Sequence, residues 1–305
     1  MNRMDGVLII DKPAGLTSHD VVAKVRHILQ VRRVGHTGTL DPFATGVMVI
    51  LVGQATRLAQ FLDKDEKEYE ALVHFGFETD TGDRTGTRSA ECGMRNEEIA
   101  DLIVTTDWDE ILRQFRGRIE QVPPMYSAKK IEGKKLYELA RKGQVIERKA
   151  AAVTVHELEI FSGEEIHTPH STLRIRVVCS AGTYIRTLAE DIGRAVGVGA
   201  HLAELRRTRA GRFDICEAVT LSDLQEAADP TTALIPMSEA VIHLPAVVLD
   251  EDRIPKTRNG LSSRFPDARL ADGDSVRMIT AGGDLIAIGV YRADEKTVQP
   301  KVVLG

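Results

Sequence analysis

The sequence predicts an α+β protein in which a large domain, built on a mixed and mainly antiparallel sheet, is followed by a small β-rich domain. Strand-like and helical patterns both occur, but without the regular alternation of a doubly wound fold. The 305 residues are enough for one large core and a small second domain. From about residue 246, short strand-like runs with Gly-containing turns replace the longer elements. We therefore place the two domains at residues 1–245 and 246–305.

The elements of the first half are recognised by their apolar periodicity. Residues 47–52 form a continuous apolar run, which is typical of a buried strand, whereas residues 69–77 alternate like a half-buried strand. Ser18 is a suitable N-cap for the helix that follows it. In order, we predict a strand at 6–10, a helix from Ser18 to Leu29, a strand at 47–52, a helix at 54–62, a strand at 69–77 and a loop at 76–93.

The second half contains two clear helix signals. A helical stripe runs from Ile185 to Val196 and ends at Gly197, a residue type that favours helix C-termini. Thr220 and Asp223 have the spacing of a capping box. In order, we predict a helix at 108–116 ended by Gly117, an irregular segment at 121–128, a helix near 135–142, a strand at 173–177, a helix at 185–196 and a capped helix after Thr220.

Composition excludes several classes of protein. The contents of 43% hydrophobic and 28% charged residues are ordinary for a globular protein. The longest apolar run, residues 47–52, is far shorter than the ~18 residues of a membrane span. The N-terminus lacks the basic start and long apolar core of a signal peptide. We therefore expect a cytoplasmic protein without membrane contact.

Metal and disulfide sites are not expected. Cys92, Cys179 and Cys216 are odd in number and widely spaced, which argues against a disulfide framework and against a zinc site. Cys179 follows apolar residues and is expected to be buried as a small hydrophobe. His167 and His170 lie beside two glutamates, but a neighbouring proline and polar residues favour a surface loop over a metal cluster.

Basic residues cluster locally although the chain carries a net charge of −5, which argues against indiscriminate nucleic-acid binding. Between residues 129 and 149, eight Lys and Arg residues oppose three Glu residues, a local charge of +5. Residues 206–212 include four arginines, and Arg32 and Arg33 form a third cluster. Each cluster alone is most often a solvated face, but three clusters flanking the motifs described next favour an RNA-binding track.

The segment at residues 35–46 (GHTGTLDPFATG) places one carboxylate, Asp41, in a loop with three glycines and a proline. Gly and Pro set backbone conformations that other residues resist, so the loop is shaped, and the apolar run after it provides a rigid anchor. An isolated Asp-Pro pair would more often be a simple turn. Three further motifs lie at 11–20 (DKPAGLTSHD), 67–71 (KEYEA) and 182–188 (GTYIRTL).

Together, these four ordered segments resemble the motifs of the TruB-type tRNA pseudouridine synthase family. The resemblance covers about residues 6–219 and is looser beyond them; Phe43 replaces the usual leucine in the central motif. It implies a catalytic domain of the pseudouridine synthase fold, a basic RNA-clamping insertion at about residues 124–149 and a C-terminal PUA-like RNA-binding domain. The implied activity is isomerisation of the uridine at position 55, in the T loop of tRNA, to pseudouridine.

The resemblance also implies the catalytic residues. Asp41 matches the family's catalytic Asp, which acts as a nucleophile or base; attack on C1′ and proton removal from C2′ both stay open. Arg186 matches the active-site arginine and can hold that carboxylate ionised and oriented, while a structural ion pair is the alternative. Tyr69 matches the active-site tyrosine, whose ring can stack on a flipped base. Its place on an alternating strand would otherwise make it a core residue.

The substrate contacts rest on the same resemblance. His36 corresponds to the residue that enters the T loop, Leu205 to a leucine of the pocket, and Lys12 to a residue that supports the site. The predicted substrate-binding residues are His36, Tyr184, Leu205, Lys12, Lys129, Lys130, Lys134, Lys135, Arg206 and Arg207.

The expected partner is the T arm of tRNA, bound by a monomer without a metal or small-molecule cofactor. The isomerisation involves no redox change, and the sequence contains neither a P-loop nor a dinucleotide fingerprint. Two alternatives stay open: a non-catalytic tRNA-binding or tRNA-folding protein, and a pseudouridine synthase that acts on another RNA. The presence of Asp41, Tyr69 and Arg186 together favours the enzyme, and the segments around Lys12 and at residues 35–38 favour a tRNA substrate.

Overall fold

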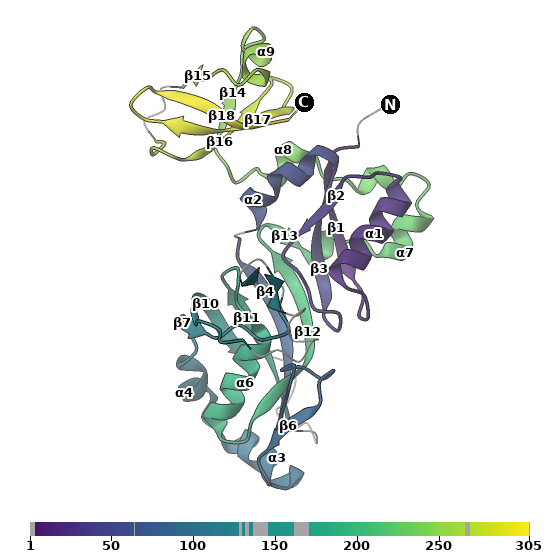
Figure 1. Cartoon of the computed structure of the whole chain (residues 1–305), viewed down its shortest axis with the longest axis vertical. Coiled ribbons are helices and arrows are strands. Elements are labelled where there is room, and N and C mark those ends of the chain that lie inside the picture. Colours follow the sequence, from purple (N-terminus) through teal and green to yellow (C-terminus); the bar gives the residue numbers. More distant parts are fainter. Residues whose placement is uncertain are drawn as a thin grey trace.

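The computed structural model describes residues 4–63, 65–127, 130–131, 134–136, 146–161, 171–265 and 269–304. The molecule is elongated, with a small β-rich part at one end and a long twisted sheet through the rest (Figure 1).

Nine strands of the described residues form one sheet, with the main order β1-β3-β12-β4-β11-β10-β7; β2 pairs with β3, and β13 with β12. The strand pairs are antiparallel except β3 and β12, which are parallel. The predicted fold class, α+β with a mixed and mainly antiparallel sheet, is confirmed. The strands are β1 (Gly6–Lys12), β2 (Val34–Thr37), β3 (Thr45–Val52), β4 (Lys67–Phe75), β7 (Gly117–Gln121), β10 (Ala151–Ile160), β11 (Thr172–Cys179), β12 (Ala200–Ala210) and β13 (Phe213–Asp214).

Two groups of helices cover this sheet. The helices α3 (Asn96–Thr105), α4 (Trp108–Arg113) and α6 (Ile185–Val196) share one apolar core with β4, β11 and β12. The helices α1 (Ser18–Leu29) and α7 (Leu221–Glu226) share another with β1 and β3, and lie beside those strands in Figure 1. In α6, the apolar stripe faces inward and Gly197 ends the helix with φ +91°, a left-handed conformation that glycine adopts at little cost.

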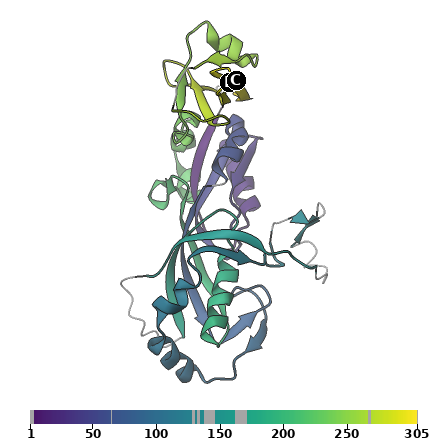
Figure 2. The same ribbon diagram turned by 90° about the vertical axis from the view of Figure 1, so that its left-hand side faces the viewer.

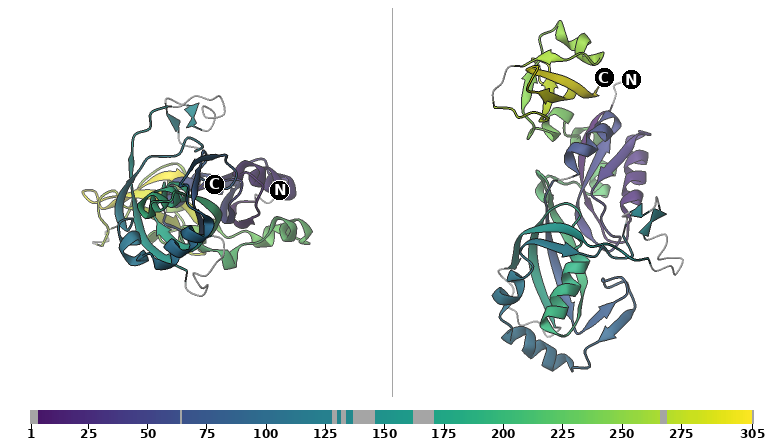
Figure 3. Two further views of the ribbon diagram at one scale, coloured as in Figure 1. Left: turned by 90° about the horizontal axis from the view of Figure 1, so that it is seen from below. Right: turned by 60° about the vertical axis from the view of Figure 1, so that its left-hand side comes forward.

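Short elements complete this part of the chain. The 3₁₀-helix η1 (Gly53–Leu58) leads into α2 (Ala59–Leu62), and two hairpins extend from the main sheet: β5 (Phe77–Thr79) with β6 (Arg88–Glu91), and β8 (Lys130–Ile131) with β9 (Lys134–Lys135). The β8–β9 hairpin projects from the body of the molecule (Figures 2 and 3). The remaining elements before the second sheet are η2 (Ile215–Glu217), η3 (Pro230–Ala233) and α8 (Met237–Ala240).

A second sheet has the order β14-β16-β17-β18-β15. Its elements are β14 (Ala246–Val248), α9 (Arg253–Arg258), β15 (Ser263–Arg264), β16 (Ser275–Ile279), β17 (Leu285–Arg292) and β18 (Thr297–Val303). This sheet is anchored to the rest of the molecule, because Leu285 and Ile288 belong to the same apolar core as Val47 and Leu58. The Arg57 side chain also donates a hydrogen bond to the carbonyl oxygen of Val303.

Several element predictions require correction. Thr17, and not Ser18, is the N-cap of α1, since its side chain accepts from the Asp20 N–H. The predicted helix at 54–62 divides into η1 and α2, and the helix at 108–116 ends at Arg113. The segment at 76–93 was expected to be only a loop but contains the β5–β6 hairpin. Apart from residues 135 and 136, the helix predicted near 135–142 lies outside the described residues.

Cys92, Cys179 and Cys216 are free in the structure, and Cys179 is buried, as predicted. Burial raises the pKa of the Cys179 thiol to about 11. The residues around His167 and His170 lie outside the described part of the chain. In the described part, no group of side chains is arranged to hold a metal ion, and none of the helices has the length and apolar character needed to span a bilayer.

Candidate active site

The loop that carries Asp41 connects β2 to β3, and a glycine at the start of β3 fixes its far end. Gly46 has φ +100°, and a Cβ atom there would lie 2.1 Å from the carbonyl oxygen of Arg207 in the neighbouring strand β12. Only glycine allows β3 and β12 to approach so closely at this point. The loop is therefore held at the junction of the two strands that pair in parallel.

Both neighbours of Asp41 are fixed by the segment between β1 and α1. The Ser18 hydroxyl accepts from the Leu40 N–H at 3.0 Å and contacts the Leu40 carbonyl oxygen at 3.1 Å. On the other side, the carbonyl oxygen of Pro42 accepts from the Gly15 N–H at 2.8 Å and from Lys12 Nζ at 3.3 Å. The backbone on both sides of the carboxylate is thus held before any substrate binds.

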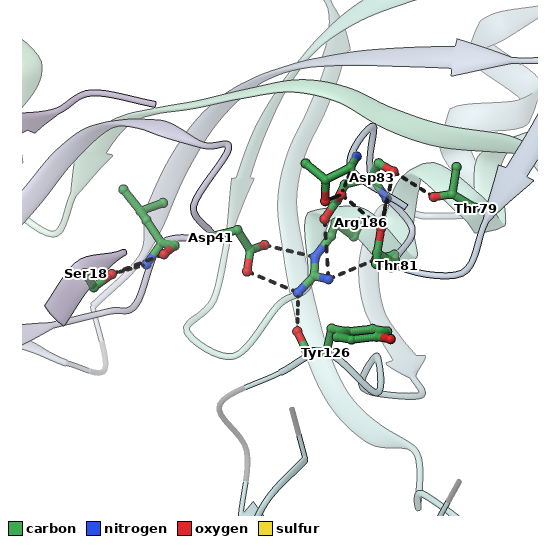
Figure 4. Close-up of polar contacts among 9 residues, drawn as sticks. Ser18, Asp41, Thr79, Thr81, Asp83, Tyr126 and Arg186 are labelled. Atoms are coloured by element: carbon green, nitrogen blue, oxygen red, sulfur yellow. Dashed lines mark hydrogen bonds and ion pairs between the residues drawn. The ribbon is translucent and has the colours of Figure 1, made fainter. Parts of the chain in front are cut away.

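Asp41 forms a two-point ion pair with Arg186 in the first turn of α6 (Figure 4). Arg186 Nε lies 2.9 Å from Asp41 Oδ2, and Nη2 lies 3.2 Å from Oδ1. The Arg186 side chain is only 5% exposed, whereas that of Asp41 is 30% exposed, so the carboxylate is the partner that can reach a ligand. A planar guanidinium is suited to such two-point contact, and a lysine ammonium is not.

Three further groups contact the Arg186 guanidinium and fix its position. Its Nη1 donates to the Thr81 carbonyl oxygen at 2.9 Å, and its Nη2 donates to the Tyr126 carbonyl oxygen at 2.7 Å. The buried carboxylate of Asp83 lies 3.7 Å from Nη1. Asp83 is itself fixed, because its Oδ1 accepts hydrogen bonds from Thr81 Oγ1 and from the N–H and hydroxyl of Thr85.

Electrostatics at this site oppose ionisation of the nucleophile candidate. Burial raises the pKa of Asp41, the Asp83 carboxylate raises it further, and the charges of Arg186 and Lys12 act in the opposite direction. Burial lowers the pKa of Lys12 to about 8. Burial also raises the pKa of the Tyr69 hydroxyl, and the adjacent Arg207 guanidinium opposes that shift.

A cavity of about 250 Å³ opens beside the ion pair. It brings together Asp41, Arg186 and Tyr69, the three residues predicted to be catalytic, from a loop, a helix and a strand that are far apart in the sequence. Of the predicted substrate contacts, it also includes Tyr184, Leu205 and Arg207. Further lining residues are Gly38, Thr39, Leu40, Asp63, Lys67, Ser127, Ser180, Ala181, Gly182, Thr183 and Ile185.

The other predicted contacts that the structure describes are not among the residues that line this cavity. Lys12 is fully buried, and His36 lies in β2 with its ring 5.7 Å from that of His19. Lys129 lies outside the described residues, while the backbones of Lys130, Lys134 and Lys135 form the projecting β8–β9 hairpin. This hairpin projects from the body of the molecule (Figure 2).

The arginine cluster at residues 206–212 does not form one exposed basic surface. Arg207 is 1% exposed and donates to the carbonyl oxygens of Val47 at 2.7 Å and Gly38 at 2.9 Å. Arg206 forms an ion pair with Asp11 at 2.7 Å. Arg206 and Arg207 are neighbours in β12, yet one pairs with a carboxylate and the other binds backbone carbonyl oxygens.

Sequence reasoning did not identify Asp83, Asp63 or Lys67 as site residues. Lys67 Nζ donates to the carbonyl oxygens of Asp63 and Asp65, and the Asp63 carboxylate accepts from the Gly38 N–H at 3.2 Å. These residues connect β4 to the loop of Asp41. The available signal was the set of threonines around Asp83, which can donate hydrogen bonds to a single buried carboxylate.

Comparison with solved structures places this fold in a class. A structure described as an H/ACA RNP bound to a substrate RNA containing 2′-deoxyuridine matches with a TM-score of 0.73 and 28% identity, over 99% of this chain and 86% of that chain. A Cbf5-Nop10-Gar1 complex matches with a TM-score of 0.70 and 29% identity, over 99% of this chain and 85% of that chain. The chain has the fold of the pseudouridine synthases.

Sequence relatives narrow the class to one family. Residues 26–185 match the N-terminal domain of the TruB family pseudouridylate synthases, and residues 186–242 match the tRNA pseudouridylate synthase B C-terminal domain. The tRNA pseudouridine synthase B of Solibacter usitatus is 42% identical over 94% of this chain and 95% of its own length. That of Geobacillus thermodenitrificans is 44% identical over 94% of this chain and 95% of its own length. The chain belongs to the TruB family.

Proposed function

We propose that this protein isomerises a uridine of tRNA to pseudouridine, and that the substrate uridine is the one at position 55 in the T loop. The observation that carries the proposal is the Asp41–Arg186 ion pair, which lies beside a cavity lined by Tyr69. The curated relatives that span nearly the full chain bear the name tRNA pseudouridine synthase B. We assign Asp41, Tyr69 and Arg186 as the catalytic residues, as the resemblance of their motifs to that family implies.

In the proposed reaction, the N1–C1′ bond breaks, the uracil turns, and a C5–C1′ bond forms, after which C5 loses its proton. Asp41 is the carboxylate that acts on the ribose, either by attack on C1′ or by removal of the C2′ proton. Arg186 keeps Asp41 oriented and opposes the rise of its pKa. Asp83 contacts the Arg186 guanidinium and is not among the residues that line the cavity, so we assign it as a positioning residue that acts through Arg186.

The base must leave the RNA stack to enter the cavity. Tyr69 on β4 and Leu205 on the neighbouring strand β12 provide an aromatic and an aliphatic surface of the cavity wall, against which a flipped uracil can stack. Tyr184 and Arg207 also line this space. We assign to His36, on the strand that leads to the Asp41 loop, contact with the RNA around the space that the flipped base leaves.

RNA binding is proposed to involve two further parts. The basic insertion at about residues 124–149 includes the projecting β8–β9 hairpin and would close on the T arm (Figures 2 and 3). Residues 246–305 form the β-rich part that we assign as a PUA-like domain, after a catalytic domain of residues 1–245. We propose that a monomer carries out the reaction in the cytoplasm.

The test is a T-arm RNA incubated with the protein, followed by chemical mapping of pseudouridine. Pseudouridine at position 55 is expected with the wild type and not with Asp41→Asn, in which an amide keeps the shape but loses nucleophilicity and basicity. Binding of the variant to RNA should stay within about tenfold of the wild type. A wild type that binds the RNA without converting it would instead indicate a non-catalytic RNA-binding protein, and conversion only of another RNA would change the substrate.

A further inference from the structure

Ser127 has a buried hydroxyl without a hydrogen-bond partner among the residues that the structure describes. It is 4% exposed, and its Oγ makes no hydrogen bond. The side chain lines the same cavity as Asp41 and Arg186. A buried hydroxyl is normally paired, so one that is left unpaired at the wall of a cavity points to a ligand that completes it.

The other serine of this cavity is already paired. Ser180 Oγ accepts from the Thr154 N–H at 2.9 Å, and the adjacent Thr183 hydroxyl donates to the Ser180 carbonyl oxygen at 2.9 Å. These groups hold the loop before α6. Ser127 Oγ makes no such hydrogen bond to any residue that the structure describes, so this hydroxyl is available to a molecule that enters the cavity.

The segment that carries Ser127 is firmly positioned. Gln121 is buried, and its side-chain amide forms two hydrogen bonds with the backbone of Tyr184, at 2.9 and 3.2 Å. Arg148 donates to the carbonyl oxygen of Pro123 at 3.0 Å. These contacts fix the entry to the basic insertion against the start of α6.

The residue before Ser127 is attached directly to the ion pair. Arg186 Nη2 donates both to the Tyr126 carbonyl oxygen at 2.7 Å and to Asp41 Oδ1 at 3.2 Å (Figure 4). Ser127 therefore follows directly the residue whose carbonyl oxygen shares Arg186 Nη2 with the Asp41 carboxylate. A group held this way is preorganised with respect to the reacting centre.

We propose that the Ser127 hydroxyl hydrogen-bonds to an oxygen atom of the flipped-out uridine, either a ribose hydroxyl or a base carbonyl, and helps to position this nucleotide next to Asp41. The inference rests on the proposed function, since it assumes that a uridine occupies the cavity. Uridine fits this role because O2 and O4 of the base accept hydrogen bonds and the ribose 2′-hydroxyl both donates and accepts them.

The test combines Ser127→Ala with T-arm RNAs in which the target uridine is replaced by 2′-deoxyuridine, 2-thiouridine or 4-thiouridine. Dissociation constants are measured for all RNAs, and single-turnover rates wherever product forms. On unmodified RNA, Ser127→Ala should lower the rate or the affinity about fivefold or more, because a polar group of the nucleotide loses its partner. On the one RNA that lacks the contacted oxygen, wild type and variant should behave alike.

Ser222→Ala is the matched control, since Ser222 is exposed on α7 and outside the cavity. Equal rates and affinities of wild type and Ser127→Ala on unmodified RNA would overturn the inference. It would also fail if the deficit of Ser127→Ala stayed the same on all three modified RNAs, since the serine would then act through the protein structure. If the wild type itself formed no pseudouridine, the proposed function would fail first, so the two failures are distinguishable.

Discussion

At the scale of single residues, the main question is how Asp41 stays reactive. Burial and Asp83 raise its pKa, while the close contact with Arg186 favours the charged form. The surroundings of Asp41 therefore favour its neutral form, while the contact with Arg186 favours its ionised form. Asp83 has two opposing effects, because it fixes Arg186 and at the same time repels the charge on Asp41.

This arrangement predicts the acid limb of the pH–rate profile. Since only the ionised carboxylate is a nucleophile or base, single-turnover rate should fall as pH falls through the pKa of Asp41. The structure raises this pKa above the ordinary value of 3.8, so the midpoint should lie above 3.8. Removal of the Asp83 charge in Asp83→Asn should move the midpoint to lower pH. A wild-type midpoint at or below 3.8 would show that Arg186 outweighs burial.

Tyr69 provides a ring and a hydroxyl whose roles can be separated. Stacking on the base needs only the ring, so Tyr69→Phe should bind tRNA with nearly wild-type affinity. If the hydroxyl takes the C5 proton, this variant should cleave the glycosidic bond and re-attach the base, but stall before proton release. Tyr69→Leu should lose affinity as well. Trapping of the stalled species by rapid quench tests the first part, and full turnover by the Phe variant would leave only the stacking role.

At the scale of elements, the most informative contact is that between the start of α1 and the loop of Asp41. The Ser18 hydroxyl contacts both backbone polar groups of Leu40, the residue before Asp41, and Ser18 is 1% exposed. The helix thereby acts as a support for the catalytic loop. Its first residue fixes the loop, while Thr17 and Asp20 satisfy the helix terminus.

Ser18→Ala should slow the reaction without a matching loss of RNA affinity. The substitution leaves the N–H and C=O of Leu40 buried without this partner, which costs about 1–3 kcal/mol and lets the loop drift from its productive geometry. Thr17→Ala is the matched control, because loss of the N-cap costs about 1 kcal/mol without touching Leu40. Rates are compared at saturating RNA beside thermal unfolding. Equal rate losses in the two variants would mean that Ser18 acts only through helix stability.

The elements differ in how far sequence could predict them. Strands β1 and β3 follow from continuous apolar runs and helix α6 from a helical apolar period, which local sequence shows directly. The central strand β12 was not predicted, because its pairing with β4 shifts register near Leu202 and again near Arg207. Such bulges interrupt the two-residue period on which strand prediction depends.

The site was predictable to the extent that its residues lie in motifs. Asp41, Tyr69 and Arg186 stand in three recognisable segments, and the structure brings them to one cavity. Asp83 and Ser127 could not be assigned in this way, since their importance arises from contacts with residues distant in sequence. Ser18 was read as a helix cap, and only the fold shows that its hydroxyl faces Leu40.

At the scale of the whole molecule, charge is unevenly arranged. The chain carries a net charge of −5, yet residues 129–149 carry a local +5. Lys130, Lys134 and Lys135 lie on the β8–β9 hairpin that projects from the body of the protein (Figure 3). Arg186 donates a hydrogen bond to the carbonyl oxygen of Tyr126, at the entry to this insertion. RNA contacts made by the hairpin would therefore be connected to the active site through the backbone of the insertion.

The hairpin should supply affinity rather than chemistry. Replacing Lys129, Lys130, Lys134 and Lys135 by Gln removes up to four phosphate contacts. Binding should weaken, and the slope of log K against log salt should fall by up to about 3, because fewer counterions are released. Rate at saturating RNA should change much less than affinity.

The control for this prediction carries the same change in total charge elsewhere. Arg88, Arg95, Arg113 and Arg118 are exposed and lie outside the basic insertion, and their replacement by Gln should leave the slope nearly unchanged. Two pairs, Arg88 with Glu91 and Arg95 with Glu98, are exposed ion pairs of little consequence for stability. If both sets of variants weakened binding and lowered the slope equally, RNA would be responding to total charge. The clamp would then have to be sought outside the hairpin.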